Sequence, residues 1–131
     1  MALVVLDASV VIAFFDQHDA HHAAAVAALE KLIEDELVLP ASAYAELLVF
    51  PNRRGGAAAV ATAKALLVQL PIRVEPIGAA IAERAAALRA STPRLRLPDT
   101  LVLATADVLD ADVVLTADRG WLKASRRVRT I

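Results

Sequence analysis

Cysteine is absent from this chain of 131 residues, and aromatic residues make up only 4% of it. Without cysteine there are no disulfides and no Cys-ligated zinc, which is consistent with a reducing cytoplasm, where we expect the protein to act. No apolar run approaches the roughly 18–20 residues that span a bilayer, and no basic segment precedes an apolar one, so neither a membrane anchor nor a signal peptide is expected. The net charge of −1 means that any binding to nucleic acid would have to be local.

What the chain does have is a composition that is 58% hydrophobic, in which short apolar segments alternate with helical patterns. We predict strands at residues 3–6, 37–40, 72–75, 112–116 and 126–131 and helices at residues 10–15, 20–34, 42–50, 57–70, 78–89 and 99–109, with loops at residues 51–56 and 91–98. This alternation is typical of βα units. It predicts one α/β domain over residues 1–131, a three-layer α/β/α sandwich with a mostly parallel sheet of roughly five strands.

Four acids stand at element boundaries or in apolar surroundings: Asp7, Glu46, Asp99 and Asp118. Each has a simple explanation when it is taken singly. Asp7 and Asp99 suit the start of a helix, Asp118 suits a turn, and Glu46 suits an exposed helical position. Ser9 is predicted to cap the helix at residues 10–15.

Taken together, the four acids point to a metal site. In a parallel sheet the ligand crevice lies at the carboxyl ends of the strands, where Asp7 and Asp118 are expected. No basic residue adjoins Asp7, Glu46 or Asp99 in the sequence, so converging carboxylates would repel one another unless a cation lay between them. Oxygen ligands suit Mg²⁺ or Mn²⁺, and such sites hydrolyse phosphodiesters with a metal-activated water.

Other polar residues give weaker signals. Asp107 lies eight residues after Asp99, about 12 Å along a helix, so the two should not share an ion. The histidines His18, His21 and His22 have the spacing of a transition-metal site, but a solvated loop explains them better.

Three basic spots occur at residues 53–54, 94–96 and 126–129. Each alone is explained by solubility. Because an acidic site needs positive charge nearby to attract a phosphate backbone, Arg94 and Arg96 are the favoured contacts for a nucleic-acid backbone.

Four segments resemble the PIN domain, in particular the VapC-type toxins of bacterial toxin–antitoxin pairs. They are "VVLDASVVIAFF", "PASAYAELL", "LPDTLVLATA" and "VVLTADRGW". The resemblance implies an α/β/α sandwich and an Mg²⁺- or Mn²⁺-dependent endoribonuclease. The residues that match the acidic ligands of the family are Asp7, Glu46, Asp99 and Asp118, and those that match its supporting hydroxyl residues are Ser9 and Thr116. Ala117 stands where many relatives have Asn, and Trp121 where many have Phe. The fourth acid is also the most variable ligand of the family, so Asp118 is the least secure of the four.

The resemblance also implies partners and a mechanism. The partners are an RNA substrate, a cognate antitoxin and a second copy of the chain, with no membrane. Asp7, Asp99 and Asp118 would hold the ion directly or through water, and Glu46 would bind a second ion, orient the water or act as a base. In-line attack by this water would leave a 5′-phosphate and a 3′-hydroxyl.

Three alternatives remain. A receiver-like binding module is disfavoured because Asp7 stands alone after its strand and the strands at 37–40 and 72–75 do not end in Asp. A degenerate PIN scaffold is disfavoured because all four acids are present. A DNA 5′-nuclease would need an arch and a DNA-binding helical motif, for which 131 residues leave no room.

Overall fold

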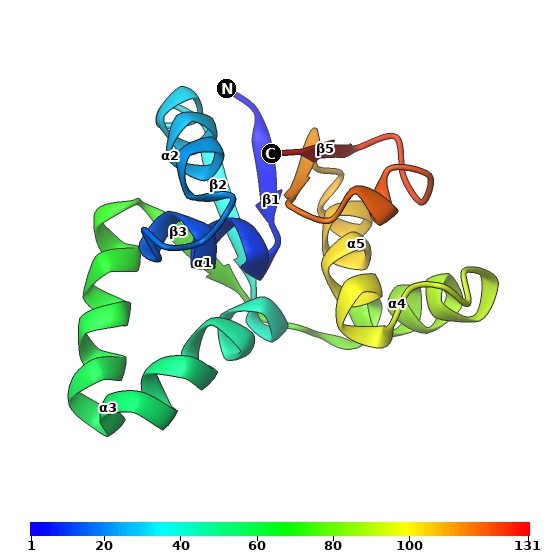
Figure 1. The fold of residues 1–131 in the computed structure, drawn as a ribbon. Coiled ribbons are helices and arrows are strands. Elements are labelled where there is room, and N and C mark those ends of the chain that lie inside the picture. Colours follow the sequence, from blue (N-terminus) through cyan, green and yellow to red (C-terminus); the bar gives the residue numbers. More distant parts are fainter.

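The computed structural model describes residues 1–131 and contains one sheet of five parallel strands (Figure 1). The strands are β1 (Leu3–Leu6), β2 (Glu36–Pro40), β3 (Ile72–Glu75), β4 (Val113–Thr116) and β5 (Val128–Thr130), in the order β3-β2-β1-β4-β5. The helices are α1 (Ala8–Phe15), α2 (His22–Lys31), α3 (Ala41–Gln69), α4 (Ala79–Ser91) and α5 (Leu97–Leu109), and a 3₁₀ turn follows at Arg119–Trp121. None of the helices has the length and apolar character needed to cross a bilayer.

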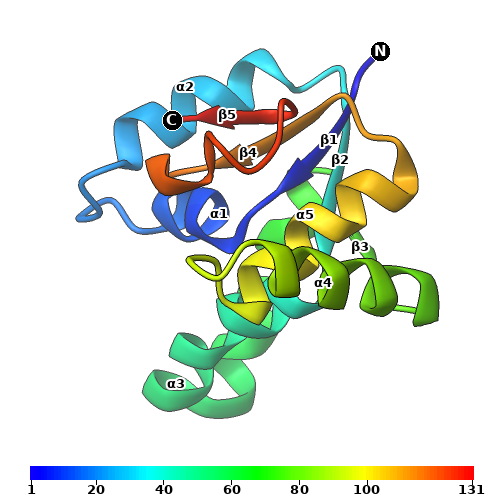
Figure 2. The ribbon, with the colours of Figure 1, turned by 90° about the vertical axis from the view of Figure 1, so that its right-hand side faces the viewer.

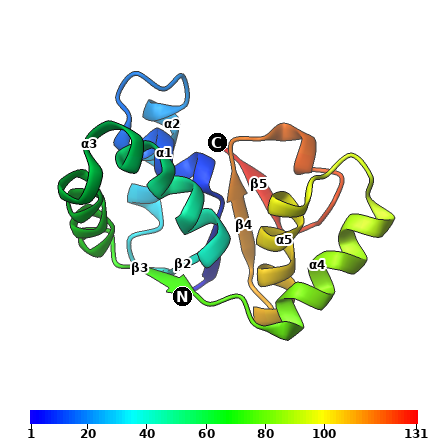
Figure 3. The ribbon, with the colours of Figure 1, turned by 90° about the horizontal axis from the view of Figure 1, so that it is seen from below.

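The helices form two layers around the sheet, as the sequence predicts. In Figure 3, α4 and α5 lie on one side of β4 and β5, and α1, α2 and α3 lie on the other. The bent middle of α3 projects away from the sheet, and the second half of the helix returns to the sheet and leads into β3 (Figure 2). The predicted α/β/α sandwich is therefore confirmed, with all five strands parallel.

The core is built on the two central strands. Val4, Val5 and Leu6 of β1 and Val114 of β4 are fully buried or nearly so, because helices cover both faces of the sheet. Val5 pairs with Val114 in the register of the two strands. Burial on both faces explains the uninterrupted apolar run of β1.

The strand order places a ligand crevice at one point of the sheet. From β1 the chain moves outward to β2 and β3, and β4 then returns to the other side of β1. A parallel sheet opens at such a change of direction, outside the carboxyl ends of the strands. Residues Asp7 and Thr116 lie at this edge, at the ends of β1 and β4.

Two details of the predicted elements are wrong. Residues 51–56 are not a loop, because α3 continues through Pro51 and bends at Gly56, where φ is 61° and ψ is −146°. Only glycine adopts this backbone readily, so Gly56 joins two helical arms at a kink, and the second arm begins at residue 57, as the sequence predicts. The side chain of Asn52 donates to the carbonyl of Leu48 and satisfies an acceptor near the proline.

The second correction concerns Ser9. Helix α1 begins at Ala8 with Asp7 at the N-cap position, so Ser9 lies inside the helix and does not cap it. The Asp7 side chain makes no capping bond either. Both side chains form other hydrogen bonds, which are described below. These residues at the start of α1 therefore contribute to the site rather than to capping the helix.

Candidate active site

Asp7 is a buried carboxylate at the junction of β1 and α1. Its backbone N–H donates to the carbonyl of Leu115 at 2.9 Å, which extends the ladder between β1 and β4 by one residue. Its side chain is 9% exposed. Oδ2 accepts two hydroxyl bonds, from Ser9 Oγ at 2.6 Å and from Thr116 Oγ1 at 2.9 Å. The charge is therefore solvated by two neutral donors and has no basic side chain hydrogen-bonded to it.

The same two hydroxyls hold the loop that follows β4. Ser9 Oγ accepts from the backbone N–H of Ala117 at 3.0 Å, and Thr116 Oγ1 accepts from that of Asp118 at 3.1 Å. Each hydroxyl thus donates to Asp7 and accepts from one of two successive amides. This arrangement fixes the backbone of Asp118 relative to Asp7. It is consistent with the prediction that Ser9 and Thr116 hold the site residues in place.

Asp99 lies in the first turn of α5. Its Oδ2 accepts from the backbone N–H of Arg96 at 3.0 Å, which satisfies an amide at the start of the helix. The helix-start role predicted for Asp99 is therefore real, and it uses only one of the two carboxylate oxygens.

Asp99 lies close enough to Asp7 and to Glu46 for its charge to raise the pKa of both. Burial raises the pKa of Asp7 above its ordinary value of 3.8, and the charge of Asp99 raises it further, while the bonds from Ser9 and Thr116 oppose the rise. Partial burial also raises the pKa of Glu46, and the charges of Asp7 and Asp99 add to the rise. The arrangement collects negative charge at the edge of the sheet.

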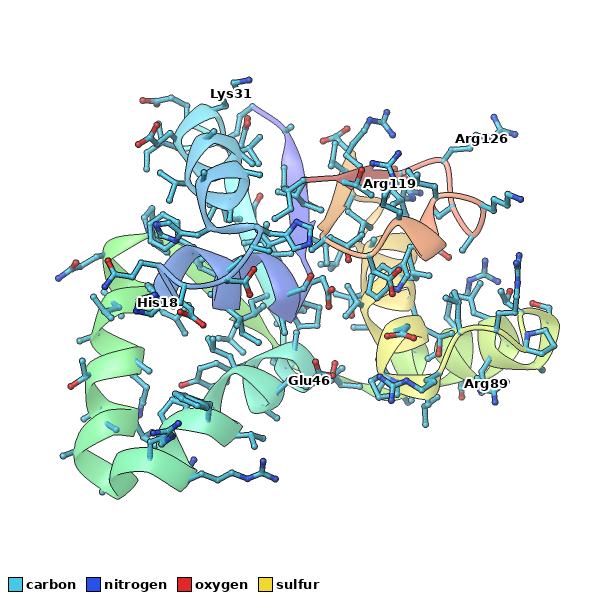
Figure 4. All side chains as sticks on the ribbon, viewed as in Figure 1. His18, Lys31, Glu46, Arg89, Arg119 and Arg126 are labelled. Atoms are coloured by element: carbon cyan, nitrogen blue, oxygen red, sulfur yellow. The ribbon has the colours of Figure 1, made fainter.

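Glu46 is an exposed side chain on the first part of α3, which agrees with the simple explanation that the sequence offers for it. Figure 4 shows it between the two halves of the molecule. The guanidinium of Arg96 lowers the pKa of Glu46 and partly offsets the acids. A basic residue therefore lies near the site in space although none adjoins Glu46 in the sequence.

Asp118 is less closely associated with the other three acids. Its carboxylate is exposed, and Oδ1 accepts from the N–H of Gly120 at 2.8 Å. Its backbone is tied to the site through Thr116, but its charge does not contribute to the raised pKa of Asp7 or of Glu46. The sequence also identifies Asp118 as the least secure ligand.

The donors suit Mg²⁺ or Mn²⁺ in kind, although no three carboxylates or imidazoles lie close enough to hold one ion in common. Asp7, Asp99 and Asp118 each have one oxygen occupied by the hydrogen bonds described above and a second oxygen that takes no side-chain bond. A buried carboxylate next to a second one is stabilised by a cation. The residues therefore fit a divalent ion held by few direct carboxylate bonds and by water, which is how proteins usually hold Mg²⁺.

The remaining candidates separate clearly. Asp107 forms ion pairs with Arg84 and Arg127, away from the four acids, in agreement with its exclusion. His18 and His21 are exposed, and their backbone amides bond to Asp16 and Asp19. His22 differs, because it begins α2, is half-buried and has its Nδ1 at 2.8 Å from the carbonyl oxygen of Ala13. The predicted solvated loop is therefore confirmed for His18 and His21 and wrong for His22.

A groove that the sequence does not reveal lies beside the acids. It has a volume of about 550 Å³ and runs between α1 and the two arms of α3. Its lining includes the apolar side chains of Ile12, Phe50 and Leu66, all exposed, and Glu46 stands in its wall. The kink at Gly56 forms the groove by turning α3 back, and that kink was predicted as a loop.

The hydroxyl pair gives a direct prediction for stability. Thr116→Val keeps the shape of the side chain but removes a donor to Asp7 and the acceptor for the N–H of Asp118. We expect the free energy of unfolding to fall by about 1–2 kcal/mol, because a buried polar group loses its partner. Urea unfolding measures the loss, and Thr62→Val at an exposed position of α3 is the control. A Thr116→Val protein as stable as the control would show that the hydroxyl bonds contribute nothing.

Comparison with known proteins agrees with this geometry. The sequence profile of the PIN domain matches residues 4–127. No curated protein sequence matches the chain. Among solved structures, a toxin–antitoxin complex from Klebsiella pneumoniae is 24% identical, with a TM-score of 0.75 over 97% of this chain and 96% of that chain.

Two further solved structures share the fold at lower identity. VapBC2 from Rickettsia felis, bound to a DNA fragment from its promoter, is 12% identical, with a TM-score of 0.78 over 98% of both chains. VapC20 from Mycobacterium tuberculosis, a toxin that cleaves the sarcin–ricin loop, is 20% identical, with a TM-score of 0.74 over 93% of this chain and 95% of that chain. These likenesses concern the fold, whereas the profile extends over nearly all of the sequence. The chain belongs to the PIN domain family.

Proposed function

We propose that the protein is a divalent-metal-dependent endoribonuclease of the VapC type, the toxin of a toxin–antitoxin pair. The observation that supports this most is the group of three acids at the carboxyl edge of the sheet, Asp7, Glu46 and Asp99, in which burial and mutual repulsion raise the pKa of Asp7 and of Glu46. Acids with perturbed pKa values cluster at functional sites, and a divalent ion stabilises neighbouring carboxylates. The similar solved structures include a toxin–antitoxin complex from Klebsiella pneumoniae and VapBC proteins from Rickettsia felis and Salmonella typhimurium.

Each residue has a defined task in this proposal. Asp7 and Asp99 would hold the ion, Asp7 with the carboxylate that Ser9 and Thr116 keep in place, and Asp118 would assist from the loop after β4. The ion would supply a water of lowered pKa and neutralise charge on the phosphate. Glu46, which is exposed and has a raised pKa, would orient the attacking water or accept its proton. In-line attack of the water on phosphorus would break the P–O3′ bond and leave a 5′-phosphate and, after protonation of the leaving oxygen, a 3′-hydroxyl.

Cleavage of RNA tests the proposal directly. The purified protein is incubated with total bacterial RNA and Mn²⁺, and new 5′-phosphate ends are mapped by sequencing. We expect a small set of defined cuts that disappear when EDTA removes the ion and return when Mn²⁺ is restored. Cleavage that is unaffected by EDTA, or none in any RNA preparation, would refute the proposal.

The alternatives find less support. A receiver-like module needs an acid pair after its first strand and a free phospho-acceptor, whereas Asp7 stands alone and Glu75 at the end of β3 forms an ion pair with Arg73. A PIN scaffold without activity would not need to hold Asp7 and the Asp118 loop together through two hydroxyls. Neither alternative explains why Asp7, Glu46 and Asp99 lie close together at the edge of the sheet.

We also propose an antitoxin partner for the apolar groove. Exposed Phe50 and Leu66 offer apolar surface of the kind that a partner helix covers, and Glu46 in the wall could receive a basic side chain of that partner. An antitoxin bound there would block the acids directly. The same family resemblance suggests a homodimer, which light scattering after gel filtration tests.

The groove proposal predicts a separation of two properties. Leu66→Glu places a charge on the apolar wall, so we expect the affinity for a co-expressed antitoxin to fall by about 10-fold or more, which is a loss of about 1.4 kcal/mol or more. Val68→Glu, also exposed on α3 but outside the groove, is the matched control. Both variants should cleave RNA normally. An unchanged antitoxin affinity for Leu66→Glu would place the partner elsewhere.

A further inference from the structure

Positive charge is concentrated in one part of the chain. Residues 84–131 contain nine Lys or Arg and five Asp or Glu, whereas residues 1–83 contain five and ten. Figure 4 shows Arg89, Arg119 and Arg126 on the same half of the molecule, the half of α4 and α5. A nearly neutral protein therefore has one basic side, and the acids lie at its border.

A small pocket lies on this basic side, between the loop before α5 and the loop after β4. It has a volume of about 120 Å³, and its lining consists of Thr92, Arg94, Leu95, Gly120, Lys123 and Ala124. The two loops thus contribute one cation each, and no acid is among the lining residues. A pocket of this size with two cations and a hydroxyl fits a single phosphate group.

Both walls of the pocket are anchored in the core. Leu95 is 6% exposed and Trp121 is 1% exposed, so each loop inserts one apolar side chain beside its cation. The N–H of Leu95 donates to the carbonyl of Thr92 at 3.0 Å, and that of Ala124 donates to the carbonyl of Trp121 at 2.9 Å. The cations are therefore presented by ordered backbone, which lowers the entropy cost of binding a ligand.

The cations of the pocket are free to bind. Neither Arg94 nor Lys123 takes part in any of the ion pairs, and both side chains are exposed. Arg127, only four residues beyond Lys123, is instead paired with Asp107 and Asp110. Arg127 is therefore neutralised by acids at the C-terminal end of α5, whereas Arg94 and Lys123 in the pocket have no acidic partner.

The pocket adjoins the acids through both of its walls. Gly120, which lines it, donates its N–H to Asp118 at 2.8 Å. Arg96, two residues after Arg94, donates its N–H to Asp99, and its guanidinium acts on Glu46. A chain lying in the pocket is therefore led to the carboxylates.

We infer that Arg94 and Lys123 bind a phosphate of the RNA backbone that is not the one cleaved, and so hold the strand in position across the acids. The inference rests on the proposed function and adds a second phosphate contact to it. Because both cations approach the backbone, the contact strengthens binding for RNA of any sequence.

Anisotropy of a fluorescein-labelled single-stranded RNA in EDTA measures this contact without cleavage. The variant is Arg94→Ala/Lys123→Ala, and the matched control is Lys31→Ala/Lys64→Ala, which removes two exposed, unpaired cations from α2 and α3. For the variant we expect weaker binding at low salt, with the slope of log K against log salt reduced by about 0.7, the value for one phosphate contact on a single strand. The loss should be the same for RNAs of different sequence, and circular dichroism should show an intact fold.

The possible outcomes separate the inference from the proposed function. If the wild type cleaves RNA but the variant binds with unchanged affinity and slope, the inference is wrong and the function stands. If the wild type neither binds nor cleaves RNA, both are wrong. If the variant keeps its affinity for RNA but loses affinity for an antitoxin, the pocket receives an acidic protein segment, which also overturns the inference.

Discussion

Asp7→Asn is expected to lower the rate of RNA cleavage by more than about 100-fold. A loss of about 100-fold is the upper end of the effect of mutating residues that only contact a metal ligand, and Asp7 is proposed to be a ligand itself. Asparagine has nearly the same shape, and its carbonyl oxygen can still accept from Ser9 and Thr116. The variant therefore removes the charge and leaves the packing of the β1–α1 junction in place. The rate is measured at a fixed Mn²⁺ concentration on the RNA site found with the wild type.

A matched control for Asp7→Asn is available at the C-terminal end of α5. Asp110→Asn makes the same chemical change at a side chain that is exposed and far along the helix from Asp99. Its backbone is left-handed, with φ of 51°, a conformation that asparagine tolerates. The control should cleave at the wild-type rate. An Asp7→Asn protein that cleaves within threefold of the control would contradict the proposed role of Asp7.

The metal ion is expected to stabilise the fold through the same residue. At a Mn²⁺ concentration of about 100 times the dissociation constant, the free energy of unfolding of the wild type should rise by about 2.7 kcal/mol. Asp7→Asn should gain nothing under the same conditions. Urea unfolding with and without Mn²⁺ measures both values, and equal gains in the two proteins would mean that the ion binds elsewhere.

Without metal, the charge on Asp7 should make stability depend on pH in a defined direction. The pKa of Asp7 is raised in the folded state, so the folded protein binds more protons than the unfolded chain at intermediate pH. Its contribution to the free energy of unfolding is then constant below the ordinary pKa of 3.8, falls as pH rises through the folded pKa, and is constant again above it. Glu46 acts in the same direction, but its exposure to solvent makes its share smaller.

The consequence is that metal-free Asp7→Asn should be more stable than the wild type at pH 7. We expect a gain of about 0.5–2 kcal/mol, the usual range for a single stabilising substitution, at the expense of activity. The difference between the two proteins should shrink as pH falls toward 4. A variant that is less stable than the wild type by the same amount at both pH values would instead assign Asp7 a structural role.

The sheet was predictable because its signals are local. The run at residues 3–6 is apolar on both faces, as a central parallel strand must be, and Pro71 and Gly78 mark the ends of elements. The crevice follows from the order of strands and helices alone. The same logic placed Asp7 and Asp118 at the carboxyl edge, and in the structure Asp7 accepts a hydrogen bond from Thr116 at the end of β4.

What the sequence could not supply depends on contacts between distant segments. Serine is a common capping residue, but the hydroxyl of Ser9 donates to Asp7 and accepts from the N–H of Ala117 instead of capping the helix. The Pro and Gly content of residues 51–56 indicates a loop, yet packing of both arms of α3 keeps the chain helical with one kink. The pocket at Arg94 needs Lys123 from a loop about 30 residues away, and no local pattern links the two.

The most direct test of the metal site is calorimetric titration of the purified, antitoxin-free protein with Mn²⁺, repeated on Asp7→Asn. It needs no knowledge of the RNA target. The proposed site predicts that Mn²⁺ binds the wild type and does not bind the variant. At acidic pH, binding to the wild type should release protons, because the carboxylates ionise when they bind the ion. Equal binding to both proteins, or none to a folded wild type, would contradict a metal site at Asp7.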